Sequence, residues 1–477
     1  MRRLVASILL WGAAAAQDAP SAEPSEPLMP SDVAASAARH YPEVVSALAD
    51  RDGAAGALLG ARGAFDTVFS VDARSRVAGF YDGQVAEAKA ERYFAPDSPL
   101  AGARLYGGYR LSRGDFPIYE NEAFTNEGGE LKVGILFSLL RDRLIDARRF
   151  GILDAELSLR QADLEVALTR IGVQRRALLS YYEWVEAGRE LDVFRDLLDL
   201  SETRQTAFER QVERGARAAI FLTENGQNLT RRRILVERAE RDLALAANAL
   251  SLYYRGPGGE PLVPGPARLP AVVPLPPPIG DAALPDILSR RPELAVLRTA
   301  AERARARLDL AENALRPRLD LGAEVGQDFG AIGEGGPTFD EGEVILGLNF
   351  EMPLGNRAAR GQRAEARADA RRIEADRRLL ADRIEAELRD VLIALETAER
   401  LVALARLEAE QAEAMRAAEQ RRFEAGASDF FLVNLREEAV ADARIKLAMA
   451  LLELNAARTT YDAAVMDTGR LGLGPGL

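Results

Sequence analysis

Few residue types in this 477-residue chain could carry out catalytic or metal chemistry. The chain has no cysteine and a single histidine, His40. The composition therefore argues against a thiol nucleophile, a cysteine-ligated metal, a histidine-based triad and a multi-histidine metal site. Paired carboxylates are abundant, but they fall on helix faces with no sign of a shared pocket. We expect a protein that is not an enzyme, with no catalytic residue, no cofactor and no metal.

The charge balance excludes a further class of function. The formal net charge is −12, and nucleic-acid binding proteins carry a basic footprint instead. Aromatic residues make up only 6% of the chain, and the abundance of Ala, Leu, Arg and Glu is typical of long helices. We interpret the run Arg231-Arg232-Arg233 as a solvated helix face and His40 as incidental.

Two short breaks with matching spacing are the most informative local pattern. One extends from Val212 to Leu222 and the other from Phe423 to Val433. Gly215 and Gly426 stand at equivalent places in them, where glycine would supply the left-handed conformation that ends a helix. Each break therefore predicts the tip of a helical hairpin.

Long helices must lead into these tips. Segments of about 70 residues, at about 143–213 and about 357–424, contain no Pro and predict helices about 100 Å long. In the second, apolar residues from Ile384 to Ala405 recur with heptad spacing, which predicts coiled-coil packing. Return helices are expected at about 217–253 and about 428–462.

Strands with period-two alternation precede each long helix. We expect four of them, at about 65–80, 131–140, 318–326 and 343–351. Four strands cannot close a barrel, which needs about eight or more, so the pattern suggests an oligomer that shares one barrel. Aromatic residues in the long connection between the first two strands form an interfacial belt or merely pack within a loop; they are Tyr106, Tyr109, Phe116 and Tyr119.

The same order of elements occurs twice. The helix openings Tyr41-Pro42-Glu43 and Arg291-Pro292-Glu293 correspond, and an N-terminal basic and apolar segment predicts a secretory signal. The fold class is mostly α with membrane β, built from a duplicated helix, strand-pair and long-helix-hairpin unit. The expected segments are a signal peptide at 1–16, a first repeat at 17–255, a Pro/Gly-rich connector at 256–281, a second repeat at 282–466 and a flexible tail at 467–477.

This ordered duplication resembles the outer-membrane efflux protein family of TolC-like channels, over essentially the whole mature chain. The resemblance implies a homotrimer with a 12-stranded shared β-barrel in the outer membrane and a periplasmic α-helical tunnel. It also implies passive export in a tripartite efflux or type I secretion system, with a periplasmic adaptor protein and an inner-membrane pump or ABC exporter as partners. Because the chain has no cysteine, we expect no lipid anchor and attachment through the barrel alone.

The resemblance also suggests roles for residues at the tips. In the family, acidic residues beyond the tip glycine often close a periplasmic gate, but Leu432, Leu435, Phe221 and Glu224 occupy the corresponding positions here. We therefore do not expect an acidic ring in this chain. The candidates for a constriction are instead Phe221, Thr223, Glu224, Asp429, Leu432 and Asn434, unless this segment is simply a solvated helix start with Asp429 at its N-terminus.

Further expectations concern docking and the pore. Small or polar tip residues are candidates for adaptor docking: Gly215, Arg217, Gly426 and Ser428. Lys132, Asp320 and Glu324 would face the pore, and Phe137, Leu321, Leu348 and Phe350 would face lipid. A soluble periplasmic coiled-coil scaffold is the alternative to an export duct, and the sequence does not identify the transported substrate.

Overall fold

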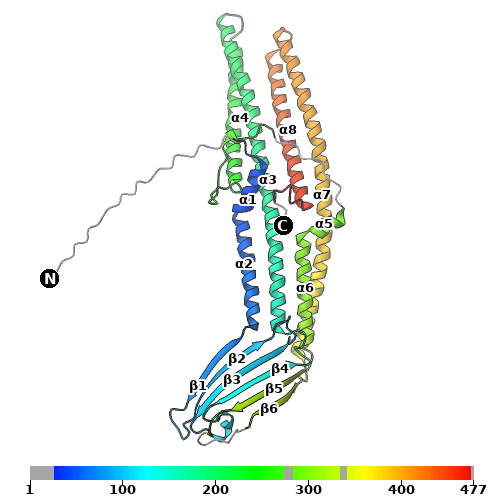
Figure 1. Cartoon of the computed structure of the whole chain (residues 1–477). Coiled ribbons are helices and arrows are strands. Elements are labelled where there is room, and N and C mark those ends of the chain that lie inside the picture. Colours follow the sequence, from blue (N-terminus) through cyan, green and yellow to red (C-terminus); the bar gives the residue numbers. More distant parts are fainter. Residues whose placement is uncertain (1–25, 273–282, 333–340, 474–477) are drawn as a thin grey trace, which may run out of the picture. The chain divides into compact units, whose positions relative to one another are not determined.

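The computed structural model describes residues 26–272, 283–332 and 341–473 (Figure 1). The expected signal peptide at 1–16 lies outside the described residues, as do parts of the connector at 256–281 and of the tail at 467–477. In the described part the chain is mostly helical and has one sheet, as the sequence predicts.

Eight α-helices occur in the described residues, and several of them have a proline in the first turn. Pro42 and Pro292 each occupy a first helical turn, where a missing backbone N–H removes no hydrogen bond. The α-helices are α1 (Pro30–His40), α2 (Pro42–Arg62), α3 (Ala147–Glu213), α4 (Ile220–Ser251), α5 (Leu284–Arg290), α6 (Pro292–Asn313), α7 (Arg357–Glu424) and α8 (Phe430–Ala464). Short 3-10 turns lie at Gly63–Phe65, Ile118–Ala123 and Pro266–Arg268.

Heptad spacing explains the burial along α7. The seven apolar residues of the predicted stripe are each no more than 9% exposed: Ile384, Leu388, Val391, Leu395, Ala398, Val402 and Ala405. Along α3, Leu157, Ile171, Leu178 and Val185 are buried, whereas Leu153 remains 38% exposed. No helix in the described part of the chain is long and apolar enough to cross a membrane.

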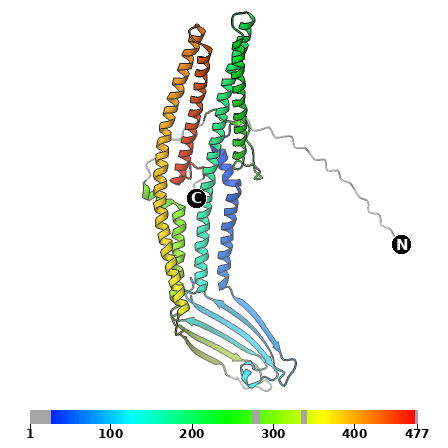
Figure 2. The same ribbon diagram turned by 180° about the vertical axis from the view of Figure 1, so that it is seen from behind.

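The sheet has six antiparallel strands, in the order in which they occur in the chain. Figures 1 and 2 show β1 and β6 at its two edges. The strands are β1 (Val68–Ser75), β2 (Gln84–Tyr93), β3 (Ala103–Arg113), β4 (Glu130–Ser138), β5 (Arg318–Asp328) and β6 (Glu343–Glu351).

The expectation of four strands is therefore wrong, because β2 and β3 occupy what was expected to be a long connection. The alternation in these two strands is weak. Alanines at positions 86, 88 and 90 form most of the apolar face of β2, and Gly107 interrupts the apolar face of β3 between Leu105 and Tyr109. A strand whose apolar face consists of small residues is hard to recognise from hydropathy alone.

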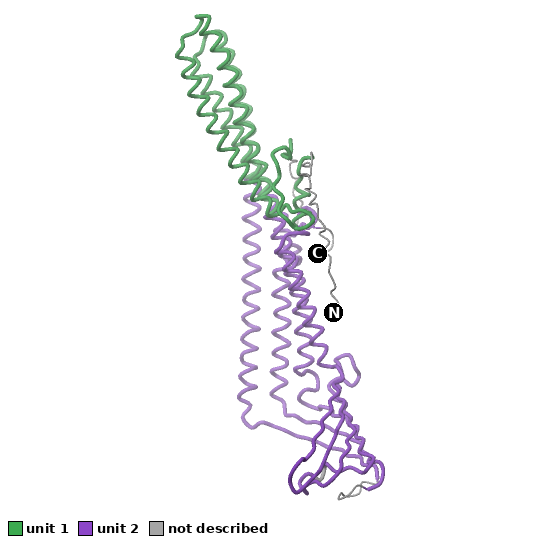
Figure 3. The backbone as a smooth tube through the Cα atoms, turned by 90° about the vertical axis from the view of Figure 1, so that its left-hand side faces the viewer, with its two compact units in different colours: residues 1–37, 177–277, 398–456 green, residues 38–176, 278–397, 457–477 purple. Residues whose placement is uncertain are grey.

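Two compact units divide the chain, and Figure 3 shows them in different colours. Unit 1 contains the described residues of 1–37, 177–277 and 398–456. Unit 2 contains those of 38–176, 278–397 and 457–477, including the whole sheet. Each unit combines segments from both halves of the sequence, so the compact units do not coincide with the expected repeats at 17–255 and 282–466.

Candidate functional site

Among the described residues, no group of three or more His, Asp or Glu side chains could hold a metal ion. The single histidine is the last residue of α1. The features that could carry function are the two faces of the sheet, in unit 2, and the two loops that end α3 and α7, in unit 1.

One face of the sheet carries the charged side chains. The register places Lys132 opposite Gly326, Glu324 opposite Gly134, and Asp320 opposite Ser138, so the three predicted polar residues share this face. Lys132 Nζ lies 3.0 Å from Glu130 Oε1 and 3.8 Å from Glu324 Oε1. The Ser138 hydroxyl donates to Asp320 over 2.9 Å. We call this surface the polar face.

The opposite face is apolar and exposed. Phe137 pairs with Leu321, and Leu321 pairs with Leu348 across the next ladder, so residues predicted to face lipid lie on one surface. Leu348 is 67% exposed and Phe350 is 61% exposed. A contiguous exposed apolar surface of this kind marks contact with a membrane or a partner. We call it the apolar face.

The four aromatic residues proposed as a belt do not form one row. Tyr106 lies on the polar face, where its hydroxyl donates to Glu324 over 2.8 Å, whereas Tyr109 lies on the apolar face. Phe116 is buried and packs edge-to-face against Phe124, while Tyr119 is 84% exposed. The residues serve different local roles because β3, which the sequence did not reveal, alternates its side chains between faces.

The two loops in unit 1 close their helices in the same way. Gly215 has φ of +67° and Gly426 has φ of +71°. The Ala216 N–H donates to Gln211 O over 2.8 Å, and the Ala427 N–H donates to Arg422 O over the same distance. These bonds are the six-to-one bonds of a Schellman motif, in which the left-handed residue satisfies helix carbonyls.

The candidates for a constriction differ in their exposure and in their hydrogen bonds. Thr223 and Asp429 are exposed, and Glu224 and Leu432 are half-buried. Asp429 accepts a hydrogen bond from the Leu432 N–H over 2.8 Å, which satisfies a free donor at the start of α8. Asn434 is only 7% exposed and accepts a bond from Arg204 over 3.1 Å.

Phe221 belongs to an aromatic cluster near the loops. Its ring centroid is 6.0 Å from that of Phe208, and Phe208 lies 5.1 Å from Phe430 in an edge-to-face arrangement. The Arg217 guanidinium lies 4.6 Å from the Phe208 ring and 4.7 Å from the Phe221 ring. Arg217, a predicted docking residue, thus stacks on the aromatic cluster of its own chain. Ser428, another predicted docking residue, hydrogen-bonds Glu419.

Unit 1 also contains a buried charge cluster that the sequence pattern does not predict. Glu437 of α8 is 2% exposed and pairs with Arg232 of α4 over 2.9 Å and with Arg204 of α3. Arg232 is 3% exposed and also donates to Leu197 O over 2.8 Å. Burial lowers the pKa of Arg232, and the hydrogen bond to Glu437 opposes that effect. The interpretation of Arg231-Arg232-Arg233 as a wholly solvated face is therefore wrong at its middle residue.

Heptad phase is the signal that would have found this cluster. Arg232 falls between Leu229 and Ala239 on the buried stripe of α4, at a position that an apolar residue would ordinarily occupy. Glu437 falls likewise between the buried Val433 and Val440 of α8. Charged residues at core positions on facing helices indicate a buried ion pair.

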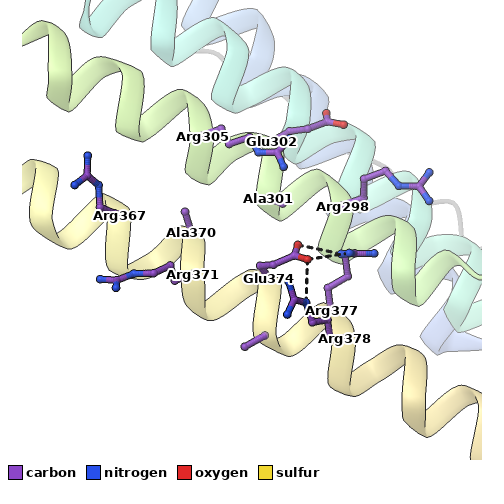
Figure 4. Close-up of a pocket in the computed structure, with 11 residues that line it drawn as sticks. Arg298, Ala301, Glu302, Arg305, Arg367, Ala370, Arg371, Glu374, Arg377 and Arg378 are labelled. Carbon is purple, nitrogen blue, oxygen red and sulfur yellow. Dashed lines mark hydrogen bonds and ion pairs between the residues drawn. The ribbon is translucent and has the colours of Figure 1, made fainter.

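A basic groove lies between α6 and α7 in unit 2 (Figure 4). Its volume is about 970 Å³, and its charged lining consists of Arg298, Glu302, Arg305, Arg367, Arg371, Glu374, Arg377 and Arg378. Arg377 and Arg378 both hydrogen-bond Glu374, and the bond from Arg377 is the main cause that lowers the pKa of Glu374 to about 2. These pairs are three and four residues apart on one exposed helix face, where they support α7 itself.

Comparison with known proteins finds a family match in sequence over part of the chain and a similarity of fold over most of it. Residues 283–465 match the family described as outer membrane efflux protein. No curated protein matches the chain.

Three solved structures illustrate the similarity of fold. The CmeC outer membrane channel of Campylobacter jejuni is 13% identical, with 91% of this chain and 84% of that chain covered and a TM-score of 0.63. The outer membrane protein VceC of Vibrio cholerae is 17% identical, with coverage of 91% and 95% and a TM-score of 0.62. The MtrE outer membrane channel of Neisseria gonorrhoeae is 13% identical, with coverage of 91% and 88% and a TM-score of 0.61.

Proposed function

We propose that this chain, a member of the outer membrane efflux protein family, is one protomer of an outer-membrane exit duct that extends into the periplasm. Substrates pass through it without chemical change, from the periplasm or an inner-membrane pump to the outside. The sheet carries this proposal, because β4, β5 and β6 divide their residues between an apolar face with exposed side chains and a face that carries charged groups.

That division fits a wall between lipid and water. The apolar face of β6 carries strongly exposed large hydrophobic residues, such as Leu346 at 75%, and on β4 and β5 Val133 and Leu321 are 47% and 43% exposed. Lipid would cover them, and water in the lumen would solvate the polar face. Lys132, Asp320 and Glu324 then line the pore.

A homotrimer supplies the rest of the wall. A membrane sheet must close on itself, and closure takes about eight strands or more, which exceeds the six of one chain. The helices of three copies would surround a periplasmic tunnel. A type I secretion system and a drug efflux system would both use a passive duct of this kind.

The hairpin loops are the proposed docking sites for a periplasmic adaptor protein. Around Gly215 and Gly426 no atom would lie within 4 Å of an added Cβ, so a partner helix has room to approach. Exposed apolar residues flank the loops, with Ile220 at 66% and Phe431 at 65%. Arg217 and Ser428 shape this surface through their contacts within the chain.

The same end of the hairpins is the proposed gate. Thr223, Glu224, Asp429 and Leu432 are accessible enough to line a constriction, whereas Phe221 and Asn434 act from within the packed hairpins. We expect Glu224→Ala to raise the closed-state current in planar bilayers. Thr230→Ala, on an exposed part of the same helix, serves as the control. Unchanged leakage in Glu224→Ala would rule out a gate role for that residue.

Cell fractionation separates this function from the alternative of a soluble periplasmic scaffold. An exit duct is recovered in the outer-membrane fraction, requires detergent for extraction and runs as an oligomer that heat dissociates. A freely soluble periplasmic pool would contradict the duct. The large exposed apolar face favours the first result, since soluble proteins rarely expose such a surface.

A further inference from the structure

We infer that three copies of this chain close an eighteen-stranded barrel, in which β6 of one copy pairs antiparallel with β1 of the next. The inference rests on the proposed function, and it replaces the twelve strands that the family resemblance implies. Each chain would contribute all six strands to the wall.

Continuous pairing places β2 and β3 in the same sheet as the other strands. β3 pairs with β4 from Ala103 opposite Phe137 to Arg110 opposite Glu130. It also pairs with β2 along ten residues. The hairpin therefore continues the sheet over its full length and does not leave it as a surface loop.

Side chains of the β2–β3 hairpin continue both the polar face and the apolar face of the sheet. On the polar face, Arg110 of β3 pairs with Glu130 of β4 over 2.5 Å, and Arg104 pairs with Glu91 of β2 over 3.2 Å. On the apolar face the hairpin carries only small or uncharged residues away from the strand ends: Ala86, Ala88, Ala90, Leu105, Gly107, Tyr109 and Leu111. Strands of a membrane barrel have this pattern, with one face toward lipid and the other toward the lumen.

The two edge strands need a partner. All residues of β1 and of β6 are exposed. Their outer N–H and C=O groups would meet lipid, where no water can satisfy them, so an open edge does not persist in a membrane. The described sheet has an even number of antiparallel strands, and β1 and β6 therefore run in opposite directions. When a second copy lies alongside, β6 of one copy and β1 of the other can pair antiparallel, which continues the up-and-down order of the strands.

Opposite charges lie on the two edge strands that would form the junction, or seam, between neighbouring copies. Arg74 near the end of β1 and Glu343 at the start of β6 belong to the polar face and to the same end of the antiparallel sheet. In the described residues of one chain, neither takes part in an ion pair of 4 Å or less. Across the seam between copies, opposite charges in this arrangement would stabilise the pairing.

The larger strand number changes the channel. Barrel diameter grows roughly in proportion to the number of strands, so eighteen strands give a lumen roughly twice the cross-sectional area of twelve. Barrels of this size leave a water-filled passage without any further opening. The narrowest part of the passage would then lie at the periplasmic end of the duct and not within its membrane wall.

Cysteine labelling tests the wall, and the native chain contributes no background cysteine. In proteoliposomes, a membrane-impermeant maleimide should label Lys89→Cys of β2 but not its neighbour Ala88→Cys. Lys132→Cys and Val133→Cys of β4 form the matched control. Equal labelling of both β2 variants, with alternation kept in β4, would overturn the inference and leave the duct intact. Equal labelling in β4 as well would instead contradict the proposed function.

Disulfide crosslinking tests the seam in the same background. Asn349→Cys of β6 is combined in turn with Val68→Cys, Ser70→Cys or Asp72→Cys of β1, which all lie on the polar face and cover different registers. At least one combination should give crosslinked species up to a trimer. Asn349→Cys with Lys132→Cys is the control that should give none, because β5 separates those strands.

Native mass spectrometry of the detergent-extracted protein then fixes the strand number. Three copies with β2 and β3 in the wall give eighteen strands. Two copies would close twelve strands and would overturn the inference, as would a trimer in which none of the β1–β6 combinations crosslinks.

Discussion

At the scale of single residues, three charges at core positions bind the hairpins of unit 1 together. Glu437 accepts hydrogen bonds from Arg204 and Arg232, and each of the three comes from a different helix. Removing one member of a buried ion pair leaves the other charge uncompensated, which costs about 3–5 kcal/mol. We predict that Glu437→Gln lowers the free energy of unfolding by about this amount in denaturant titrations followed by circular dichroism.

The adjacent residue provides the control for that prediction. Glu438 pairs with Arg231 over 3.5 Å, and both side chains are more than 40% exposed. An exposed pair contributes about 0–1 kcal/mol, so Glu438→Gln should have little effect. Equal losses in the two variants would mean that the buried cluster adds nothing beyond an ordinary surface pair.

Asp462 should make stability depend on pH in a specific direction. Burial raises its pKa to about 6, and Arg458, 3.1 Å away, opposes the shift. Because the folded pKa lies above the ordinary value of 3.8, the protonated carboxyl favours folding. That contribution is complete below about pH 4, is lost as the pH rises through about 6, and is on the order of 3 kcal/mol.

The prediction is tested with Asp462→Asn, which is neutral at every pH. The melting temperature of the variant relative to the native protein should rise between about pH 4 and about pH 7. Asp376→Asn, which alters an exposed pair with Arg372, should show no such trend. A constant difference between Asp462→Asn and the native protein over this range would show that the carboxyl is not perturbed.

At the scale of the elements, glycine closes the long helices. Gly426 has a left-handed backbone, and a Cβ added there would have no atom within 4 Å, so the cost of a side chain is conformational and not steric. Gly426→Val should lose about 1–2 kcal/mol of stability, while Gly426→Asn should lose less, because Asn tolerates this conformation. Thermal unfolding of both variants measures the difference, and equal losses would contradict a conformational cause.

Some of these elements can be predicted from the sequence and others cannot. Helix α7 contains the predicted heptads and ends where the glycine break indicates, since a long periodic pattern and a cap specify a helix well. Strands β2 and β3 were missed because Ala88 and Gly107 give no hydropathy contrast with their neighbours. Their membership in the sheet depends on pairing with β4, which is information that no local window contains.

The candidate sites followed the same rule. The glycine loops were predictable because their conformation depends on a few adjacent residues. The partners of Arg217 and Asn434 were not, because Phe208 and Arg204 reach them from another helix. A solvated charge and a buried one look alike in the sequence until the phase of the surrounding apolar stripe is taken into account.

At the scale of the whole molecule, the polar face predicts the selectivity of the channel. It carries nine carboxylates and six basic residues per chain along β1 to β6. An excess of acidic groups around a lumen concentrates cations. In a potassium chloride gradient, the reversal potential should therefore have the sign of cation selectivity and should weaken at high salt. Glu324→Gln together with Asp328→Asn should reduce it, and an anion-selective current would contradict this arrangement of the faces.

Our main proposal is that the sheet forms the wall of a water-filled duct through a membrane. Its most direct test is current recording from the purified oligomer reconstituted in a planar lipid bilayer. We expect discrete conductance steps from single inserted channels. An oligomer that is stably inserted in the bilayer and passes no ionic current at any applied voltage, even when Glu224→Ala is introduced at the proposed gate, would contradict it.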